Sequence, residues 1–289
     1  MAGHRETDAV TGTETTGHEW DGIKELNTPL PRWWLWTFYA TIVWAIGYWI
    51  VMPAWPLVND FTRGVLGYTN RAAVAERLAE ARAAQSAYIA RIEAASLDEI
   101  RSDPELLEFA LAGGRSAFAV NCSPCHGLGA AGSRGYPNLN DDAWLWGGTL
   151  DEIARTIRFG VRSGHEEARF GDMPAFVRDG LLTREQASDV AEYVLSLSGR
   201  STDAAAAERG AEVFAEQCVA CHQEGGVGSD ELGAPNLADA IWLYGGDKET
   251  IVETVSFGRA GVMPAWTGRL APATIKRLAI YVHSLGGGQ

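Results

Sequence analysis

The longest stretch without a charged residue is WWLWTFYATIVWAIGYWIVMPAWPLV, which begins at Trp33. Pro53 and Pro56 would end a helix, so the stretch predicts about 20 helical residues from Trp33 to Met52. At a rise of 1.5 Å per residue, this helix spans about 30 Å, the thickness of the hydrocarbon core of a bilayer. Tryptophans near both ends suit the two membrane interfaces. The pattern therefore predicts one transmembrane anchor within residues 32–58.

Two other interpretations of this stretch fit less well. A cleaved signal peptide is disfavoured because the preceding 32 residues carry 3 basic and 6 acidic groups and no A-x-A site follows the stretch. A buried helix of a soluble protein is rarely uncharged over such a length. The flanking basic residues do not decide the orientation, because Lys24 and Arg32 on one side balance Arg63 and Arg71 on the other.

The segments around the anchor are polar. Residues 1–19 are small, polar and charged without an apolar period, and we expect a disordered tail within an N-terminal segment 1–31. Beyond the anchor, residues 59–112 predict a helical linker. Within it, the stretch 70–95 is rich in alanine, with apolar residues near helical spacing. Ser102-Asp103-Pro104 reads as a cap that starts a further helix.

The remainder of the chain is an internal repeat. NCSPCHG recurs as QCVACHQ, AWLWGG as IWLYGG, MPAF as MPAW, and AEYVLSLSG as AIYVHSLGG. The register changes only by short insertions or deletions in loops. A small, polar stretch at 198–208 is a plausible linker between the copies. The repeat predicts two similar domains, 113–199 and 203–289.

The C-x-x-C-H motif occurs once in each copy and uses every cysteine of the chain, so no cysteine remains for a disulfide scaffold. This motif is the attachment pattern of c-type haem: two thiols on one helical turn reach the two vinyl groups, and the histidine faces the iron. A zinc site would need a fourth ligand in each copy, and a thioredoxin-like redox pair would need a βαβ setting. We expect two covalent haem c groups, held by Cys122 and Cys125, and by Cys218 and Cys221, with His126 and His222 as axial ligands.

Each iron then needs a sixth ligand or an open position. Apart from Met1 and Met52, the only methionines are Met173 and Met263, and both occur as Met-Pro-Ala at equivalent positions of the repeat. A lone methionine is more often core filler, but a matched pair is poorly explained in that way. His/Met ligation fills both axial positions and raises the reduction potential. His165, in the loop before Met173, is the one credible rival ligand.

A Pro-Asn-Leu triplet follows each histidine of the motifs. A metal-bound imidazole normally donates its other N–H to a carbonyl oxygen, which fixes the orientation of the ring. We expect the carbonyls of Pro137 and Pro235 to accept these bonds, although an ordinary turn would also explain the triplets.

The net charge of −13 argues against nucleic acid as a partner and favours basic partners. Residues 201–289 are the most acidic region, with 11 acidic and 6 basic residues, a net of −5. From this charge we expect a basic donor protein to dock first on the second domain.

Together these features resemble class I cytochrome c domains, which implies an all-α fold with one N-terminal transmembrane helix and two tandem cytochrome domains. The tryptophan-rich anchor segment and the GYTNR start of the linker resemble, over nearly the whole chain, the dihaem cytochrome c subunit of cbb3-type cytochrome c oxidases. The second motif departs slightly, with Gln223 where Gly127 stands in the first. In the family the proline carbonyl accepts the histidine bond and the methionine sulfur is the distal ligand.

The resemblance implies an electron-transfer subunit without a catalytic centre of its own. Electrons would pass from a basic donor cytochrome c, soluble or tethered, to a haem–copper catalytic subunit, with a monohaem membrane cytochrome c subunit as a further partner. Because c-type haem is attached outside the cytoplasmic membrane, the resemblance also implies a single-pass protein of the bacterial inner membrane, with a cytoplasmic N-terminus and periplasmic haem domains.

Three other functions stay open at this point. The cytochrome subunit of a membrane-bound periplasmic dehydrogenase also uses tandem c domains, but usually with a different anchor. A dihaem peroxidase would need one haem without a methionine ligand. A non-haem metal-binding module would give a colourless protein.

Overall fold

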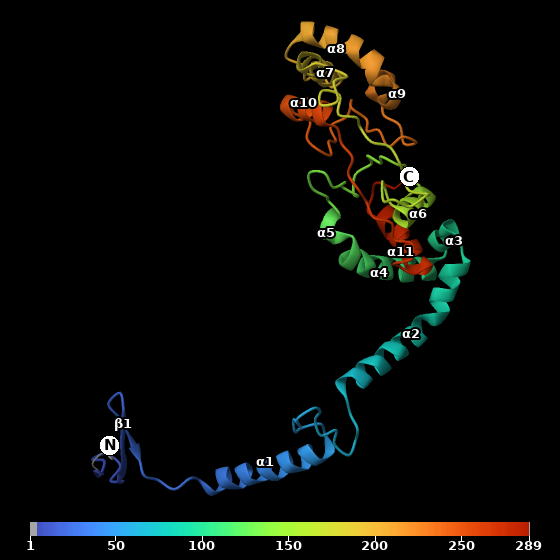
Figure 1. The fold of residues 1–289 in the computed structure, drawn as a ribbon. Helices are drawn as coiled ribbons and strands as arrows, with labels where there is room; N and C mark the ends of the chain where they lie inside the picture. The colour runs from blue at the N-terminus through green and yellow to red at the C-terminus, as the bar shows by residue number, and fades with distance from the viewer. Residues whose placement is uncertain (1–4, 289) are drawn as a thin grey trace. The chain divides into compact units, whose positions relative to one another are not determined.

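The structure is a computed structural model, and it describes residues 5–288. The chain divides into two compact units, residues 1–84 and 85–289. Figure 1 shows that the described part is mostly helical. Its elements are β1 (Thr15–Trp20), β2 (Ile23–Leu26), α1 (Arg32–Val51), α2 (Asn70–Ala94), α3 (Leu97–Ser102), α4 (Pro104–Asn121), α5 (Ser123–His126), α6 (Leu150–Phe159), α7 (Arg184–Leu197), α8 (Ala204–Gln217), α9 (Val219–His222), the 3₁₀ turn η1 (Glu224–Gly226), α10 (Lys248–Phe257) and α11 (Pro272–His283).

The N-terminal segment contains an antiparallel hairpin of β1 and β2, so the prediction of disorder up to residue 19 was wrong for residues 15–19. Its first four residues lie outside the described part. The turn is made by Asp21 and Gly22, which both have positive φ (50° and 87°). Asp-Gly is a strong signal for a two-residue hairpin turn, and the tail composition hid it. The side chain of Thr15 is buried and accepts a hydrogen bond from the Glu6 N–H (3.2 Å).

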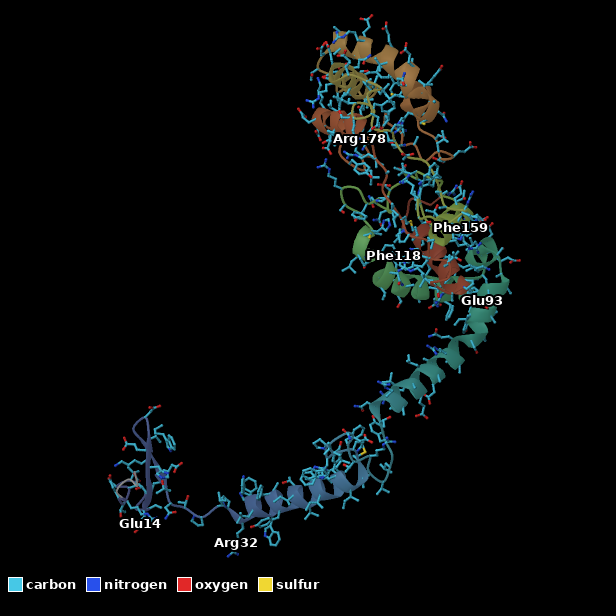
Figure 2. All side chains as sticks on the ribbon, in the orientation of Figure 1. Glu14, Arg32, Glu93, Phe118, Phe159 and Arg178 are labelled. Carbon is cyan, nitrogen blue, oxygen red and sulfur yellow. The ribbon has the colours of Figure 1, made fainter. Side chains whose placement is uncertain are left out.

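Helix α1 forms where the uncharged stretch predicts the anchor helix. It has 20 residues, begins directly after Pro31 and ends at Val51, with Met52 in an extended conformation before Pro53. Figure 2 shows side chains projecting from α1 on all sides, and none of its residues is buried. It is the only helix of the described chain that is long and apolar enough to cross a membrane.

The predicted linker helix and cap are both present. Helix α2 spans Asn70–Ala94, and the Asp103 carboxylate caps α4 by accepting bonds from the N–H groups of Glu105 and Leu106, with Pro104 as the first helical residue. Arg91 near the end of α2 pairs with Asp103 (2.8 Å) and Glu105 (2.5 Å). These contacts fix the end of α2 to the start of α4.

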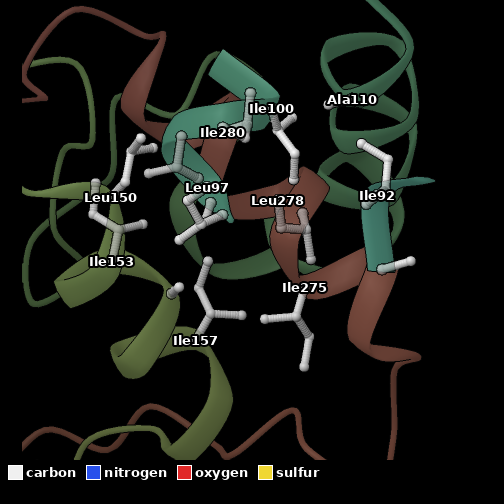
Figure 3. Packing of buried hydrophobic residues seen from close by; sticks show 14 of the residues in the cluster. Ile92, Leu97, Ile100, Ala110, Leu150, Ile153, Ile157, Ile275, Leu278 and Ile280 are labelled. Carbon is white, nitrogen blue, oxygen red and sulfur yellow. The ribbon is translucent and has the colours of Figure 1, made fainter. Parts of the chain in front are cut away.

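A first hydrophobic core lies among α3, α4, α6 and α11, which Figure 3 shows from close by. Leu278 and Ile280 of α11 meet Ile153 and Ile157 of α6 there. Helices α4 and α11 approach closely because Gly114 has no side chain: a Cβ at this position would lie 2.3 Å from the Arg277 carbonyl oxygen.

A second core lies among α7, α8 and α10. Val190 and Val194 of α7 pack there with Phe214 of α8 and Val255 of α10. Gly210 allows the close approach of α7 and α8, since a Cβ would lie 2.0 Å from the Asp189 carbonyl oxygen. Gly210 corresponds to Gly114 in the sequence repeat, so both cores use the same helix crossing.

The two cores do not follow the two sequence repeats. Helix α11 of the second repeat packs on α4 of the first, and α7 of the first repeat packs on α8 of the second. The domains expected at 113–199 and 203–289 therefore exchange their C-terminal parts. We call residues 97–160 with 263–285 the first packing unit, and residues 173–258 the second packing unit. The crossing segments, 161–172 and 259–262, join them.

The linker between α7 and α8 favours this exchange because it has only the six residues 198–203, and short loops join antiparallel neighbours. The linker is also tied down by Glu192, a fully buried residue of α7. Its carboxylate accepts bonds from the Ser201 hydroxyl (2.6 Å) and the Thr202 N–H (3.0 Å), and pairs with Lys248 at the start of α10 (2.9 Å). At the equivalent position of α11, Ile280 is buried instead.

Replacing Leu278 tests the exchanged packing. Leu278 has no exposed surface, so Leu278→Ala should lower the free energy of unfolding by about 2–5 kcal/mol. Hydrogen exchange should become faster in α4 and α6, the neighbours of α11, and stay unchanged in α8. Faster exchange in α8 with an unchanged α4 would show instead that each repeat packs on itself.

Glu192 should make stability depend on acid. The bond from Lys248, followed by that from Ser201, lowers the pKa of Glu192 from 4.5 to about 2. The stabilisation is therefore full above about pH 4.5 and is lost as the pH falls through about 2. Glu192→Gln should remove a contribution on the order of 3 kcal/mol, measured as unfolding free energy against pH. Exposed Glu212→Gln is the matched control, and equal pH profiles for both variants would contradict this role.

Candidate functional site

In each C-x-x-C-H motif, the first cysteine directly follows a long helix, and the four residues after it form one helical turn. The first cysteine of each motif ends the long helix: the N–H groups of Cys122 and Cys218 donate to the carbonyls of Phe118 and Phe214 (both 2.9 Å). The histidine N–H then donates back to the carbonyl of that cysteine (2.9 Å in both copies). The two turns, α5 and α9, therefore have the same backbone geometry.

The thiols of each pair have different surroundings. Cys125 and Cys221 are exposed, whereas burial raises the pKa of the Cys122 and Cys218 thiols to about 11. The two sulfurs of each pair are held on one turn without a disulfide.

The imidazole rings are held by the Pro-Asn-Leu loops. Nδ1 of His126 lies 3.0 Å from the Pro137 carbonyl oxygen, and Nδ1 of His222 lies 3.0 Å from the Pro235 carbonyl oxygen. Because a carbonyl only accepts, this contact places the proton on Nδ1 and leaves Nε2 free to bind a metal. Burial lowers the pKa of His222, which favours the neutral ring that metal binding requires.

A cavity lies against the second motif. Cys218, Cys221 and His222 line it on one side, and Met173 with Pro174 lines it as well. Its other walls are mostly apolar and come from both repeats: Phe176, Val190, Val194, Leu237, Trp242 and Val255. The set of two thiols, one neutral imidazole and one thioether in an apolar cavity fits a c-type haem with His/Met ligation. The Nε1–H of Trp242 is buried without a partner among the described residues, as expected where a polar group of a ligand belongs.

The first motif receives the other methionine. Met263 packs against the first core, and so do Cys122, Leu139 and Trp144. The methionines are thus exchanged with the helices: Met263 of the second repeat lies in the unit of His126, and Met173 of the first repeat lies in the cavity of His222. Each methionine thus lies in the packing unit that holds the histidine of the other repeat.

Two glycines that the sequence analysis did not single out lie in close backbone contact with these methionine loops. Gly160 follows α6 and Gly258 follows α10, both with positive φ (73° and 72°). A Cβ on Gly160 would lie 2.3 Å from the Met263 carbonyl oxygen, and one on Gly258 would lie 2.3 Å from the Met173 carbonyl oxygen. The signal was available, because Phe-Gly recurs at both positions of the repeat. Paired backbone bonds continue the contact, between Val161 and Met263 and between Met173 and Arg259.

An aromatic residue of each unit packs on a glycine of the other. Trp146 lies so close to Gly233 that a Cβ there would be 2.2 Å from the indole ring. Tyr244, the equivalent of Trp146, would lie 3.4 Å from a Cβ on Gly135. Both glycines stand two residues before the prolines that contact the histidines, so the two sites are packed against each other.

His165 contacts other groups than the two motif histidines in the described part of the chain. Its ring packs on Phe159 (centroids 4.8 Å apart), and its Nδ1 accepts a bond from the Glu167 N–H (3.0 Å). It does not line the cavity of His222. This geometry gives no support to His165 as a rival ligand.

The helical architecture and the twin His-Pro turns define the chain as a cytochrome c with two tandem cytochrome domains. Residues 109–194 and 205–282 match the family described as cytochrome c oxidase, cbb3-type, subunit III. Residues 12–59 match the N-terminal domain of cytochrome oxidase-cbb3, FixP.

Relatives of full length agree with these matches. The chain is 58% identical to the cbb3-type cytochrome c oxidase subunit FixP of Bradyrhizobium diazoefficiens, over 100% of both chains. It is 53% identical to subunit CcoP of Azospirillum brasilense over 99% of both chains, and 54% identical to subunit CcoP of Cereibacter sphaeroides over 95% of both. The chain belongs to the FixP/CcoP family, and it is a haem c-type, electron-transport subunit of a cbb3-type oxidase with a candidate membrane anchor.

The contact of Gly258 with the Met173 loop can be tested against a matched glycine. Gly268 has the same left-handed backbone (φ 74°) but nothing within 4 Å of a built Cβ. Gly268→Ala should cost about 1 kcal/mol through backbone strain alone. Gly258→Ala should cost about 1–3 kcal/mol more, because the Met173 backbone must move. Denaturant unfolding of both variants measures the difference, and equal costs would show that the contact does not matter.

Proposed function

We propose that this chain carries two covalent haem c groups and relays electrons from a donor cytochrome c to the catalytic core of the oxidase. The observation that supports this most is the pair of equivalent turns, each with an imidazole fixed on a proline carbonyl and a methionine brought in by the other repeat. The thiols of Cys122 and Cys125, and of Cys218 and Cys221, would form the thioether bonds. His126 with Met263, and His222 with Met173, would be the axial pairs.

Each haem, when bound, supplies a one-electron couple. The chain's own residues would prevent other ligands from binding and reacting there. A histidine and a methionine would hold each haem iron, so dioxygen and peroxide would find no open position to bind. The apolar walls of the cavity exclude water, and no covalent bond forms or breaks in the transfer. With a methionine placed at each site, a peroxidase function has no support from the geometry.

The exchange concentrates negative charge on one packing unit. The second packing unit, 173–258, has 15 acidic and 5 basic residues, a net of −10. The first, 97–160 with 263–285, has 9 acidic and 8 basic residues, a net of −1. A basic donor would therefore be steered to the second packing unit. This sharpens the expectation from sequence, which rested on a smaller excess in residues 201–289.

An acidic row on α8 is the best candidate for the docking face. Glu208, Glu212 and Glu216 are exposed and spaced four apart, so they share one helix face that runs towards the second motif. The equivalent positions on α4 are Ala112, Ser116 and Val120. The helix before the second motif thus carries three acidic groups where the equivalent positions before the first motif carry none, and the first packing unit would pass electrons inward.

The anchor and the partners complete the proposal. Because c-type haem is attached outside the cytoplasmic membrane, α1 would cross the bacterial inner membrane once, with the N-terminus in the cytoplasm and both haem sites in the periplasm. The electrons would reach a haem–copper catalytic subunit, with a monohaem membrane cytochrome c as a further subunit of the complex.

Charge reversal tests the docking face. The triple variant Glu208→Lys, Glu212→Lys, Glu216→Lys should slow oxidation of a basic cytochrome c at low salt by about tenfold or more, and should flatten the salt dependence of the rate. The control reverses three exposed acidic residues of the first packing unit: Glu108→Lys, Asp142→Lys, Asp151→Lys. Equal loss in both triple variants would place docking elsewhere.

The destination of the electrons is tested on the native complex. The chain is tagged at its C-terminus and extracted gently from membranes, and reduced-minus-oxidised spectra are recorded with and without carbon monoxide. We expect covalent c haem, co-purifying b haem that binds carbon monoxide, and oxygen uptake. Covalent c haem alone or with flavin, without oxygen uptake, would favour a membrane dehydrogenase. A colourless preparation would contradict haem binding altogether.

A further inference from the structure

A groove lies beside the crossing of α4 and α11, outside the candidate haem sites. It has a volume of about 490 Å³, and a stripe of α4 within residues 109–121 lines most of it, together with Gln85 of α2 and Arg277 of α11. It shares no lining residue with the cavity of His222. Val120 at its edge is 73% exposed, so the groove is open to solvent. Among its lining residues, Arg277 is the only charged one.

The guanidinium of Arg277 has donors that nothing in the described part of the chain uses. Its Nη2 donates to the Thr274 hydroxyl (3.3 Å), and the group lies over the ring of Phe109, 5.5 Å from the centroid. Its Nε–H is buried without a hydrogen-bond partner among the described residues, and Arg277 makes no ion pair with any of them. Burial lowers the pKa of Arg277. Because a buried donor without an acceptor costs free energy, this geometry favours an acceptor from outside the chain.

The second packing unit shows how the same helix crossing looks when a carboxylate is present. Arg277 and Asp189 are equivalent, because their carbonyl oxygens face the crossing glycines Gly114 and Gly210 in the two units. Asp189 accepts two bonds from Arg209 of α8, one from Nε (2.8 Å) and one from Nη2 (2.7 Å). This is the bidentate fork that arginine forms best with a carboxylate. The crossing in the second packing unit is thus neutralised within the chain.

The first packing unit keeps an arginine at this crossing but has no carboxylate for it. Gly113 stands where Arg209 stands in the second repeat. A Cβ on Gly113 would lie 2.8 Å from the guanidinium carbon of Arg277, so the missing side chain makes room for the guanidinium in the groove. The pair that the second packing unit completes within the chain is therefore open here to a carboxylate from another molecule.

The surface around Arg277 also selects the kind of partner. Three positions of α4 that line the groove are equivalent to the acidic row of α8, and they carry no charge: Ala112, Ser116 and Val120. A basic donor cytochrome c is attracted to the acidic row and gains nothing from a cation. Arginines with apolar neighbours are common in the buried centre of protein interfaces. This face therefore fits a different protein, one that carries an acidic side chain.

We propose that the groove between α4 and α11 receives an aspartate or glutamate of a neighbouring subunit of the oxidase, whose carboxylate forms a bidentate pair with Arg277. The inference rests on the proposed function, since it takes the neighbouring subunit to belong to the same oxidase complex. The first packing unit then binds the oxidase through a cation, and the second binds the donor through anions. The two partners use different faces and do not compete.

Zero-length cross-linking tests the pair in the native complex. Arg277→Lys keeps the charge and supplies a primary amine. A water-soluble carbodiimide joins such an amine to a carboxylate in direct contact as an amide, and takes up the water that is lost. Mass spectrometry of the peptides should show position 277 joined to an acidic residue of another subunit. The matched control is Arg115→Lys, which places an amine at an exposed position of α4 outside the groove and should not give this product.

Neutral and reversed charge at position 277 test whether the pair holds the subunits together. After gentle extraction through a C-terminal tag, Arg277→Gln should lower the co-purified b haem per c haem by about tenfold, and Arg277→Glu should lower it further. Both variants should keep two covalent haems and an unchanged unfolding midpoint, since no carboxylate of the described chain pairs with Arg277. Arg209→Gln is the opposite case. It should lower the unfolding midpoint, because it leaves Asp189 unpaired, and keep the subunit ratio.

Four outcomes would overturn the proposal. The first is the absence of an inter-subunit cross-link from position 277, or a cross-link only to an acidic residue of this chain. The second is an unchanged haem ratio in both Arg277→Gln and Arg277→Glu. The third is a ratio that falls together with the unfolding midpoint, which would make Arg277 a structural residue. The fourth is an unchanged ratio with weaker binding of the Arg277→Gln chain to vesicles of anionic phospholipid, which would assign the site to a lipid phosphate.

The wild-type complex distinguishes a failure of this inference from a failure of the proposed function. Co-purified b haem and oxygen uptake in the wild type, with an unchanged ratio in the variants, would contradict only the docking at Arg277. A wild-type preparation without b haem would contradict the proposed destination of the electrons before any variant is compared.

Discussion

The close backbone contact of Gly160 and Gly258 with the two methionine loops is the constraint on which the rest of the structure depends. Each glycine ends a helix of one repeat and accepts the methionine loop of the other without room for a side chain. Once the loops are exchanged in this way, α11 must pack on α4 and α7 on α8. Each packing unit then contains the histidine of one repeat and the methionine loop of the other.

The exchange also distributes charge unevenly between the two packing units. It moves the acidic residues of α7 into the unit of α8 and α10, which leaves one strongly acidic packing unit and one that is almost neutral. The same crossing brings Arg162 of the first repeat to the second cavity. Two copies of one sequence pattern thereby become two packing units with different net charge.

Local features were predictable because local chemistry determines them. The uncharged stretch predicted α1, and Asp103-Pro104 predicted the start of α4. The C-x-x-C-H motifs and the Pro-Asn-Leu triplets predicted the contacts between the histidines and the prolines. The exchange was not predictable, because two similar repeats offer the same contacts within one copy or between copies. Glu192 was a signal in the sequence that pointed to the exchange. It stands where the other repeat has Ile280, and a carboxylate buried at that position needs polar partners. Its partners lie in the linker and on α10.

A cryo-electron microscopy map of the native oxidase complex, at a resolution that shows the methionine sulfurs, tests the exchanged pairing most directly. We predict the sulfur of Met173 opposite His222 and that of Met263 opposite His126, with residues 161–172 and 259–262 crossing between the units. A map in which each methionine lies opposite the histidine of its own repeat would contradict it.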